Sequence, residues 1–164
     1  MIILNSKQIN HKLKRIASEI YERHADQNEI VLAGINTKGY LMAEKLKILL
    51  IEMGLPAVKL AHLDLNPAKP LESEARIDLE LKNLTNRIAI IIDDVANSGR
   101  TLFFAMKPFS NVLLKKLEVC VLIERMHKSY PISVDYVGLR LATTIKQNIE
   151  VEFKEFEPIA AKLN

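Results

Sequence analysis

The sequence contains a single cysteine, Cys120, which excludes a disulfide within the chain and a metal cluster held by several thiolates. Its five glycines and six prolines are too few for a low-complexity or collagen-like chain. The longest apolar runs, such as Ile88–Ile92, have five residues, whereas a helix that spans a membrane needs about 20. The first ten residues hold only a short apolar stretch, which does not form a secretory signal. These absences favour a protein of the reducing, cytoplasmic compartment with no membrane partner.

The residues that are present are typical of one globular domain. The 164 residues are 49% hydrophobic and 26% charged, close to the averages for folded proteins. A chain of this length is sufficient for a single domain of ordinary size, and we expect one domain over residues 1–164. The net charge of +3 is a small excess of 23 basic over 20 acidic side chains. Such a balance is compatible with an anionic ligand and does not require a polyanion.

The order of apolar and polar segments predicts alternating strands and helices. Strands are expected over residues 29–35, 57–65, 76–81, 87–94, 118–123, 134–137 and 149–156, and helices after an N-cap at Ser6, after Gly39 and from about Gly99. Residues 66–75, with two prolines and several charges, are expected to form a surface loop. This alternation predicts an α/β fold with a mostly parallel twisted sheet flanked by helices. Sheets of this kind bind ligands beyond the carboxyl ends of their strands.

The segment IIIDDVANSGRT, residues 90–101, ends the most apolar predicted strand with two adjacent carboxylates, Asp93 and Asp94. Charges at the end of a buried strand are costly unless something pairs with them. Small residues and a predicted helix start follow, and they offer free backbone amides and hydroxyls to an anion. The carboxylates can accept hydrogen bonds from sugar hydroxyls or reach Mg²⁺ through water. The two parts together fit a ribose 5-phosphate, and the alternative is that the acidic pair only caps a helix.

A second turn, GINTKGY, residues 34–40, follows the first predicted long strand. Gly34 and Gly39 allow a ligand to approach the backbone, Thr37 offers a hydroxyl and Lys38 offers a positive charge for phosphate. Tyr40 stands where the P-loop motif requires lysine, so a P-loop is excluded. Taken alone, this segment is more typical of an ordinary turn that uses glycine for a positive φ.

The motif IIIDDVANSGRT resembles the phosphoribosyl-pyrophosphate (PRPP) signature of type I phosphoribosyltransferases: an apolar run, two acidic residues and a phosphate loop. The segments RIASEIYERH, VLAGINTKGYLMAEKL and VLIERMHKSYPISVDYVGL resemble, in order and spacing, the branch of this family that combines pyrimidine-operon attenuation with uracil phosphoribosyltransferase activity. This resemblance implies a Rossmann-like type I phosphoribosyltransferase fold with a small C-terminal hood. It also implies transfer of the phosphoribosyl group from PRPP to a nucleobase, with a pyrimidine (uracil) favoured, and release of pyrophosphate.

The resemblance further implies a role for particular residues. Asp93 and Asp94 become the catalytic residues that hold the ribose hydroxyls. The residues expected to bind PRPP are Thr37, Lys38, Gly39, Asp93, Asp94, Ala96, Asn97, Ser98, Gly99, Arg100 and Thr101. Arg125, in the hood, is the candidate for base binding, and its alternative is a solvated arginine after a strand. Asn97 stands where the 6-oxopurine enzymes place an aspartate, which disfavours hypoxanthine and guanine.

Cofactor and partner expectations follow from the same resemblance. We expect Mg²⁺, bound mainly through the pyrophosphate of PRPP, and assemblies of two or more copies of the chain. His62 and Asp64 lack a third ligand nearby in the sequence, so we predict no metal held by the protein alone. The loop at residues 66–75, which the family closes over its site, is shorter than in the attenuator branch. The sequence therefore supports PRPP binding more strongly than turnover.

The alternative function is a regulator that senses PRPP or a nucleotide and binds RNA with little or no turnover. The basic residues that could form an RNA-binding surface are Lys7, His11, Lys12, Lys14, Arg15, Arg23, His24, Arg125, His127 and Lys128. Acidic residues are interspersed on the first helix, and no aromatic stripe accompanies the basic residues. A solvated helix face is therefore the favoured interpretation, and RNA binding is the alternative.

Overall fold

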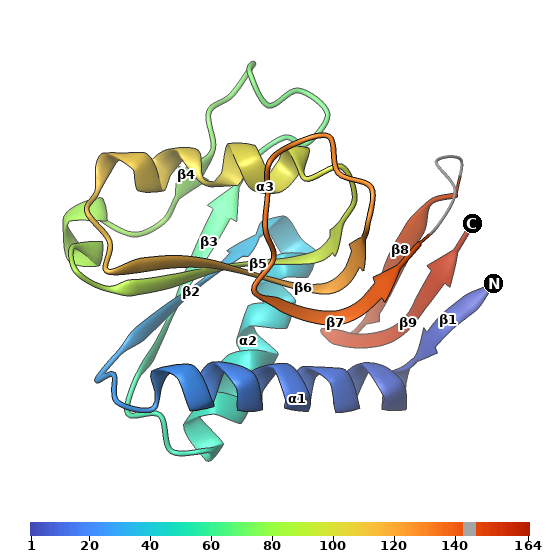
Figure 1. Cartoon of the computed structure of the whole chain (residues 1–164), viewed down its shortest axis with the longest axis horizontal. Coiled ribbons are helices and arrows are strands. Elements are labelled where there is room, and N and C mark those ends of the chain that lie inside the picture. The colour runs from blue at the N-terminus through green and yellow to red at the C-terminus, as the bar shows by residue number, and fades with distance from the viewer. Residues whose placement is uncertain (143–146) are drawn as a thin grey trace.

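The computed structural model describes residues 1–142 and 147–164, and its central feature is a six-stranded sheet with the order β4-β3-β2-β5-β6-β7 (Figure 1). The strands are β2 (Ile30–Ile35), β3 (Val58–Asp64), β4 (Arg76–Ile77), β5 (Ile88–Ala96), β6 (Lys116–Arg125) and β7 (Tyr136–Leu141). Strand β4 runs antiparallel to β3, and the other neighbouring strands are parallel. The predicted α/β fold with a mostly parallel sheet is confirmed.

Helices and turns cover both faces of this sheet (Figure 1). One face carries α1 (Ser6–His24) and α2 (Asn36–Glu52), and the other carries α3 (Arg100–Ala105) with the 3₁₀ turns Leu81–Leu84 and Lys107–Asn111. Strand β5 contributes to both cores, because Ile88, Ile90 and Ile92 face α1 and α2 while Ala89 and Ile91 face α3. A strand covered on both sides is apolar at every position, which explains the continuous run seen in the sequence.

A second, smaller sheet joins the two ends of the chain (Figure 1). Its antiparallel order is β1-β9-β8, with β1 (Ile2–Asn5), β8 (Ile149–Lys154) and β9 (Glu157–Leu163). Ile149 and Val151 are buried in the same core as α1 and α2, so this sheet packs on that side of the molecule. We call this small sheet the hood, and only β8 of it had been expected as a strand. Arg125, which the sequence analysis placed in a hood, lies instead at the end of β6 in the six-stranded sheet.

Several predicted boundaries were wrong by a few residues. Helix α1 is capped by Asn5 and not by Ser6: the Asn5 side chain accepts from the backbone N–H of Gln8, and the Gln8 side chain accepts from that of Asn5, both at 2.9 Å. Helix α2 begins at Asn36, before Gly39, so Thr37 and Lys38 lie in its first turn. The strand predicted at 134–137 begins at Tyr136, and that predicted at 76–81 has only two residues.

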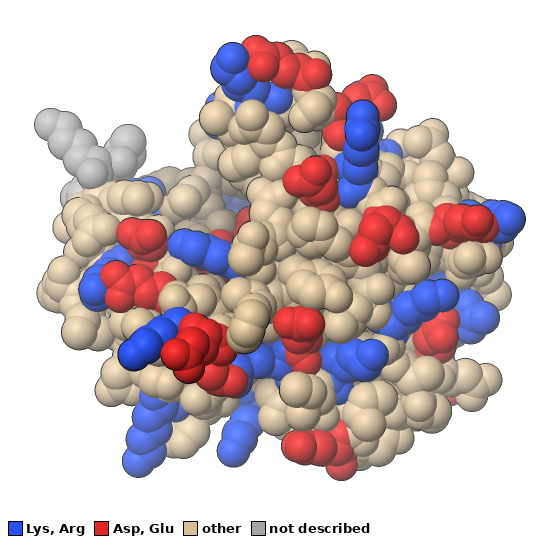
Figure 2. Space-filling view, turned by 180° about the vertical axis from the view of Figure 1, so that it is seen from behind, with Lys and Arg blue, Asp and Glu red and all other residues tan. Residues whose placement is uncertain are grey.

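The basic side chains of α1 are partly used inside the protein. Lys12 donates to the carbonyl of Gly138 at 3.1 Å, and Arg15 donates to the carbonyls of Val137 and Gly138 at 2.8 and 3.0 Å. His24, which the sequence placed among the surface cations, is 3% exposed and therefore cannot contact RNA. On the face opposite that of Figure 1, acidic and basic side chains are interspersed (Figure 2). Within residues 1–142 and 147–164, no helix has both the length and the apolar character needed to cross a membrane.

Candidate active site

The two segments predicted to bind PRPP, residues 34–40 and 90–101, meet at the carboxyl ends of β2 and β5. Gly34 of β2 pairs in register with Ile92 of β5, so the first turn of α2 lies beside the acidic pair. Asn36 secures this junction: it has a φ of 49°, and its side-chain amide donates to the carbonyl of Leu65 and accepts from its N–H at 3.0 and 3.1 Å. Asparagine tolerates a positive φ better than most residues. Asn36 was not among the predicted site residues, although an asparagine between a buried strand and a helix was the available signal.

A cavity of about 330 Å³ lies between these turns. Six of the predicted PRPP-binding residues line it, namely Thr37, Lys38, Asp93, Asp94, Asn97 and Thr101. Pro67, from the predicted loop, and Ile149, from the hood, complete part of its wall. Residues from both turns therefore surround one space, to which the hood and the loop also contribute.

Asp93 and Asp94 lie in a buried environment that favours a ligand with hydroxyl groups. Asp93 is 8% exposed, and one of its carboxylate oxygens accepts from the backbone N–H of Asp94 at 2.9 Å. Burial, and next the negative charge of Asp94, raise the pKa of Asp93 well above its ordinary value. Burial also raises the pKa of Asp94, against the opposing effects of Asp93 as a hydrogen-bond partner and of Lys38, whose Nζ lies 3.8 Å away. Ligand hydroxyls that donate to these oxygens would relieve part of this desolvation.

The segment after the acidic pair forms a tight backbone cradle. Residues 95–102 enclose a small cavity of about 40 Å³ next to the larger one. Gly99 has a φ of 83°, which other residues rarely adopt, and the N–H of Arg100 donates to the Ser98 hydroxyl at 3.3 Å. The N–H groups of Ser129 and Tyr130 donate to the Ser98 carbonyl at 2.9 and 3.1 Å. The loop is thus braced by the segment after β6, and its shape suits a phosphate group.

Gly39 lies in the first part of α2 and lines neither of the two cavities. A Cβ at this position would stand 2.4 Å from the carbonyl oxygen of Ile92, so glycine lets the start of α2 pack directly on the β5 backbone. A PRPP contact of Gly39 itself stays a prediction, and its observed place points to positioning of Thr37 and Lys38.

We expect Gly39→Ala to lower both stability and PRPP affinity, because the added methyl group pushes the start of α2 away from β5. Overpacking of this kind costs roughly 1–3 kcal/mol, measurable by urea denaturation. Gly138→Ala is the matched control, since a Cβ there would stand 2.4 Å from the carbonyl oxygen of Leu122, outside the site. Gly138→Ala should lose similar stability, but its folded fraction should bind PRPP with wild-type affinity. Equal PRPP affinity in the two variants would contradict this role of Gly39.

The predicted lid segment is a loop between β3 and β4, and it is tied to the α3 side of the sheet. Arg100 donates to the carbonyl of Pro67 at 2.8 Å, and Lys107 pairs with Glu74 at 2.6 Å. One contact lies near each end of the loop, while Leu71 between them is 83% exposed. The predicted PRPP-binding residue Arg100 therefore anchors the loop at the cavity.

Arg125, the candidate base-binding residue, is the last residue of β6 and lines neither of these two cavities. Its neighbour Glu124 is buried and bonded to Arg140 at 2.9 Å and to Lys128. Burial opposes ionisation of Glu124, but hydrogen bonds from these two cations outweigh it and lower its pKa. The role of Arg125 stays a prediction.

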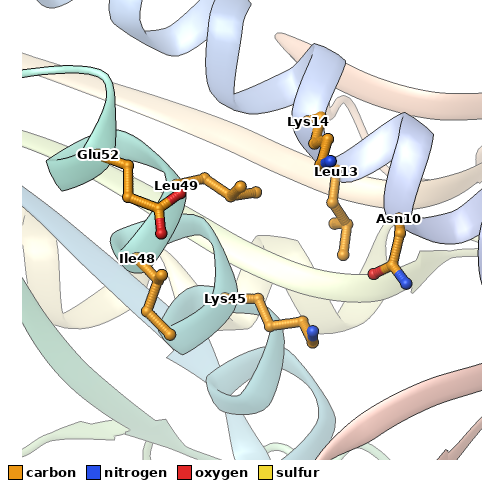
Figure 3. A pocket seen from close by; sticks show the side chains of 7 residues that line it. All are labelled: Asn10, Leu13, Lys14, Lys45, Ile48, Leu49 and Glu52. Atoms are coloured by element: carbon orange, nitrogen blue, oxygen red, sulfur yellow. The ribbon is translucent and has the colours of Figure 1, made fainter.

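Other features do not join this site. A cavity of about 350 Å³ between α1 and α2, lined by residues such as Leu13, Lys45 and Leu49, contains none of the predicted PRPP-binding or base-binding residues (Figure 3). His62 packs edge-on against Tyr40, with ring centres 5.5 Å apart. In the part of the chain that the structure describes, no group of three or more His, Cys, Asp or Glu side chains is placed to hold a metal ion.

Known proteins resemble this chain in sequence over most of its length. The sequence model of the phosphoribosyl transferase domain matches residues 2–155. The bifunctional protein PyrR of Fusobacterium nucleatum is 32% identical over 163 residues, covering 95% of this chain and 92% of that protein. PyrR of Clostridium beijerinckii is 33% identical over 163 residues, with the same coverage of 95% and 92%.

Solved structures show the same fold. A hypoxanthine phosphoribosyltransferase of Trypanosoma cruzi superposes with a TM-score of 0.77 at 15% identity, over 97% of this chain and 94% of that one. A hypoxanthine-guanine phosphoribosyltransferase of Bacillus anthracis gives 0.70 at 21% identity, over 85% and 81%. The fold is thus that of a phosphoribosyltransferase. The chain belongs to the phosphoribosyl transferase domain family, and it is similar over nearly its whole length to PyrR proteins. The resemblance stated from the motifs is confirmed.

Proposed function

We propose that this chain is a cytoplasmic enzyme that transfers the phosphoribosyl group of PRPP to a pyrimidine, with uracil as the preferred base. The observation that carries the proposal is the cavity lined by the acidic pair and Lys38, with the small cavity of the backbone loop 95–102 next to it. PRPP has the three matching parts: two ribose hydroxyls, a pyrophosphate and a 5-phosphate. Uracil is favoured by the likeness to the attenuator branch and by Asn97, which replaces the aspartate of purine enzymes.

In this proposal each part of PRPP has its own partner. Asp93 and Asp94 accept hydrogen bonds from the two ribose hydroxyls and orient the ring. The loop from Ala96 to Thr101 holds the 5-phosphate, and Lys38 with Thr37 holds the pyrophosphate. Arg125 contacts the base from the carboxyl end of β6. Fixing the base nitrogen, C1 of the ribose and the leaving pyrophosphate in line provides most of the catalysis, because the displacement needs little acid–base chemistry.

The oxygen ligands of the site suit Mg²⁺ only when the substrate is bound as well. The acidic pair offers the hard oxygen ligands that Mg²⁺ prefers, but the described residues hold no larger ligand group. The metal would therefore be bound mainly through the pyrophosphate oxygens, with Asp93 or Asp94 in contact through water. It would supply neutralisation of charge on the leaving group.

An assay with several bases tests this function. The chain, PRPP and Mg²⁺ are incubated with radiolabelled uracil, cytosine, hypoxanthine or guanine, and nucleotide formation is measured. We expect transfer to uracil and little to the purines. Transfer to hypoxanthine or guanine in place of uracil would refute the pyrimidine assignment, and no transfer to any base would refute the enzyme.

The second candidate, an RNA-binding regulator, is favoured by one observation, the likeness to relatives named bifunctional. Lys12 and Arg15 donate to carbonyls of β7, and His24 is buried. These contacts disfavour α1 as an RNA-binding surface. A gel-shift series over salt concentration tests it, because phosphate contacts make RNA affinity fall steeply with salt. For either function, we also propose that the chain assembles into dimers or larger oligomers.

A further inference from the structure

Lys38 lies on the wall between two cavities and faces two carboxylates. Its Nζ is 3.8 Å from an Asp94 oxygen and 3.8 Å from an oxygen of Glu150, which projects from β8 of the hood. The second cavity, of about 530 Å³, is lined by Thr37, Lys38 and Leu41 of α2 and by residues of β8 that include Glu150. The lysine expected to hold pyrophosphate therefore already has a counter-ion from another part of the fold.

The pairing of Glu150 with Lys38 is selective. Within the hood, Lys162 of β9 stands directly across from Glu150 in the strand register. Lys162 nevertheless pairs with the next acidic residue on the same side of β8, Glu152, at 2.6 Å. Glu150 thus pairs with Lys38, although a cation of its own sheet is in register with it.

The geometry of the pair favours exchange over a fixed bond. At 3.8 Å to each carboxylate, the ammonium group is shared and makes a short hydrogen bond to neither. The Glu150 side chain is half exposed, so the contact is weak and sensitive to salt. A pyrophosphate with several negative charges can displace such a carboxylate, but it must compete with Glu150 for Lys38 and is repelled by it.

Resting on the proposed function, we propose that Glu150 is a positioning residue that competes with the pyrophosphate group for Lys38 and thereby weakens its binding. The same pyrophosphate group is part of the substrate and leaves as the product. A carboxylate that returns to Lys38 as pyrophosphate departs favours release of that product. Glu150 belongs to the hood and so acts on the pyrophosphate end of the site, away from the 5-phosphate loop.

Calorimetric titrations of wild type, Glu150→Gln and Glu152→Gln test this role. Each protein is titrated with pyrophosphate, PRPP and ribose 5-phosphate in the presence of Mg²⁺. Glu152→Gln is the matched control, because it removes the same charge from the same side of β8 but its partner is Lys162. Glu150→Gln should bind pyrophosphate and PRPP about three- to tenfold more tightly at low ionic strength, and the gain should shrink in high salt. Ribose 5-phosphate, which lacks the pyrophosphate, should bind equally to all three proteins.

Kinetics provide a readout that a purely structural role would not move. Glu150→Gln should be inhibited more strongly by added pyrophosphate, by the same factor as its gain in affinity, and Glu152→Gln should match wild type. Unchanged or weaker pyrophosphate binding by Glu150→Gln would overturn the role of Glu150 while leaving the proposed function intact, provided that wild type binds PRPP. Failure of wild type to bind either PRPP or ribose 5-phosphate would overturn both.

Discussion

Replacing Asp93 and Asp94 together by asparagine should weaken PRPP binding by about 100-fold or more, because charge-assisted hydrogen bonds to two ribose hydroxyls contribute roughly 1.5–3 kcal/mol each. The same variant should be more stable than wild type at neutral pH. Both carboxylates are desolvated in the fold, and the pKa of each is raised by burial. Neutral amides of the same shape remove that cost and can still accept the N–H of residue 94 through an amide oxygen.

The pH dependence follows from the direction of these pKa shifts. Below the ordinary pKa of 3.8, both carboxyls are protonated in the folded and the unfolded chain, so they cost nothing. As pH rises from 3.8 through the raised folded pKa, the unfolded chain ionises first, and wild type loses stability. The difference in Tm between variant and wild type should therefore be near zero below pH 3.8 and should grow as pH rises through the raised folded pKa values.

Calorimetry with PRPP and thermal unfolding across pH provide both measurements. Asp26→Asn with Glu80→Gln is the control, because it removes two charges from exposed positions away from the site. That control should keep PRPP affinity. PRPP affinity in Asp93→Asn/Asp94→Asn equal to wild type would sink the assignment of the acidic pair to ribose.

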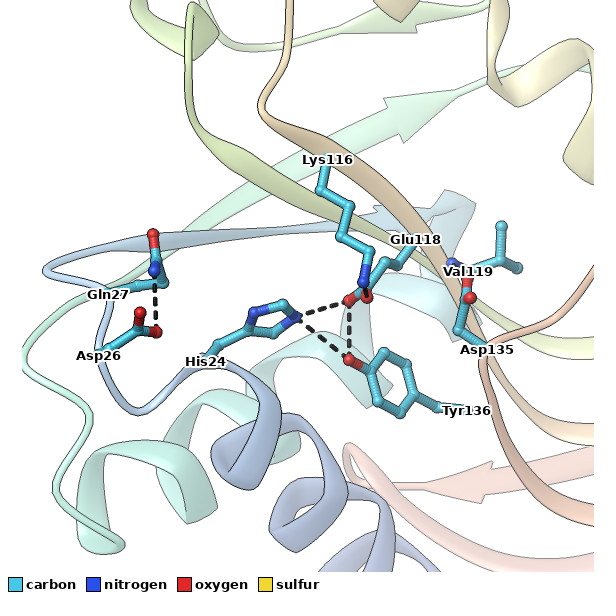
Figure 4. A network of polar contacts seen from close by, with 8 residues as sticks. All are labelled: His24, Asp26, Gln27, Lys116, Glu118, Val119, Asp135 and Tyr136. Atoms are coloured by element: carbon cyan, nitrogen blue, oxygen red, sulfur yellow. Dashed lines mark hydrogen bonds and ion pairs between the residues drawn. The ribbon is translucent and has the colours of Figure 1, made fainter.

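Glu118→Ala should destabilise the protein by about 3–5 kcal/mol at neutral pH, since it removes one member of a buried charged network. Glu118 is completely buried on β6, where it contacts His24 and the Tyr136 hydroxyl, each at 2.7 Å, and pairs with Lys116 at 2.6 Å (Figure 4). The truncation leaves His24 and Tyr136 buried without their main partner. Arg23 lies over the Tyr136 ring, 4.6 Å from its centre, and holds this end of α1 against the sheet.

The contribution of Glu118 should disappear in acid. Burial alone would raise its pKa, but hydrogen bonds from His24, Lys116 and Tyr136 outweigh burial and lower it from 4.5 to about 2. A depressed folded pKa contributes stability that is complete above pH 4.5 and is lost as pH falls from 4.5 towards about 2. The acid unfolding of wild type should therefore include a stability loss in this window.

Urea denaturation at pH 7 and a pH series of Tm measure the two effects. If Glu118→Ala does not fold, Glu118→Gln keeps the shape and an acceptor oxygen, and should show a shallower stability loss over the same pH window. The network lies at the amino ends of β6 and β7, so PRPP affinity of the folded fraction should be unchanged in Glu118→Gln. A Glu118→Gln variant with wild-type stability at every pH would contradict the role of the charge.

Much of the fold was predictable because its signals are local. Strand β5 is apolar from Ile88 to Ile92 as a consequence of burial on both faces, and the spacing of Ile9, Leu13, Ile16 and Ile20 marks the buried side of α1. The short apolar segment of β1 carried no such signal. It becomes a strand only by pairing with β9, near the other end of the chain, and a pairing between distant segments leaves no periodicity in either one.

The candidate site likewise has a part that was predictable from the sequence and a part that was not. The sequence alone determined the two turns and the residue types they carry, because the carboxylates, the glycines and the hydroxyls are contiguous in the chain. Only the tertiary structure decided that Lys38 faces both Asp94 and Glu150, that Asn36 holds the α2 junction to β3, and that Gly39 packs on β5. These contacts depend on strand order and on the register between segments far apart in the sequence, and neither is encoded in local composition.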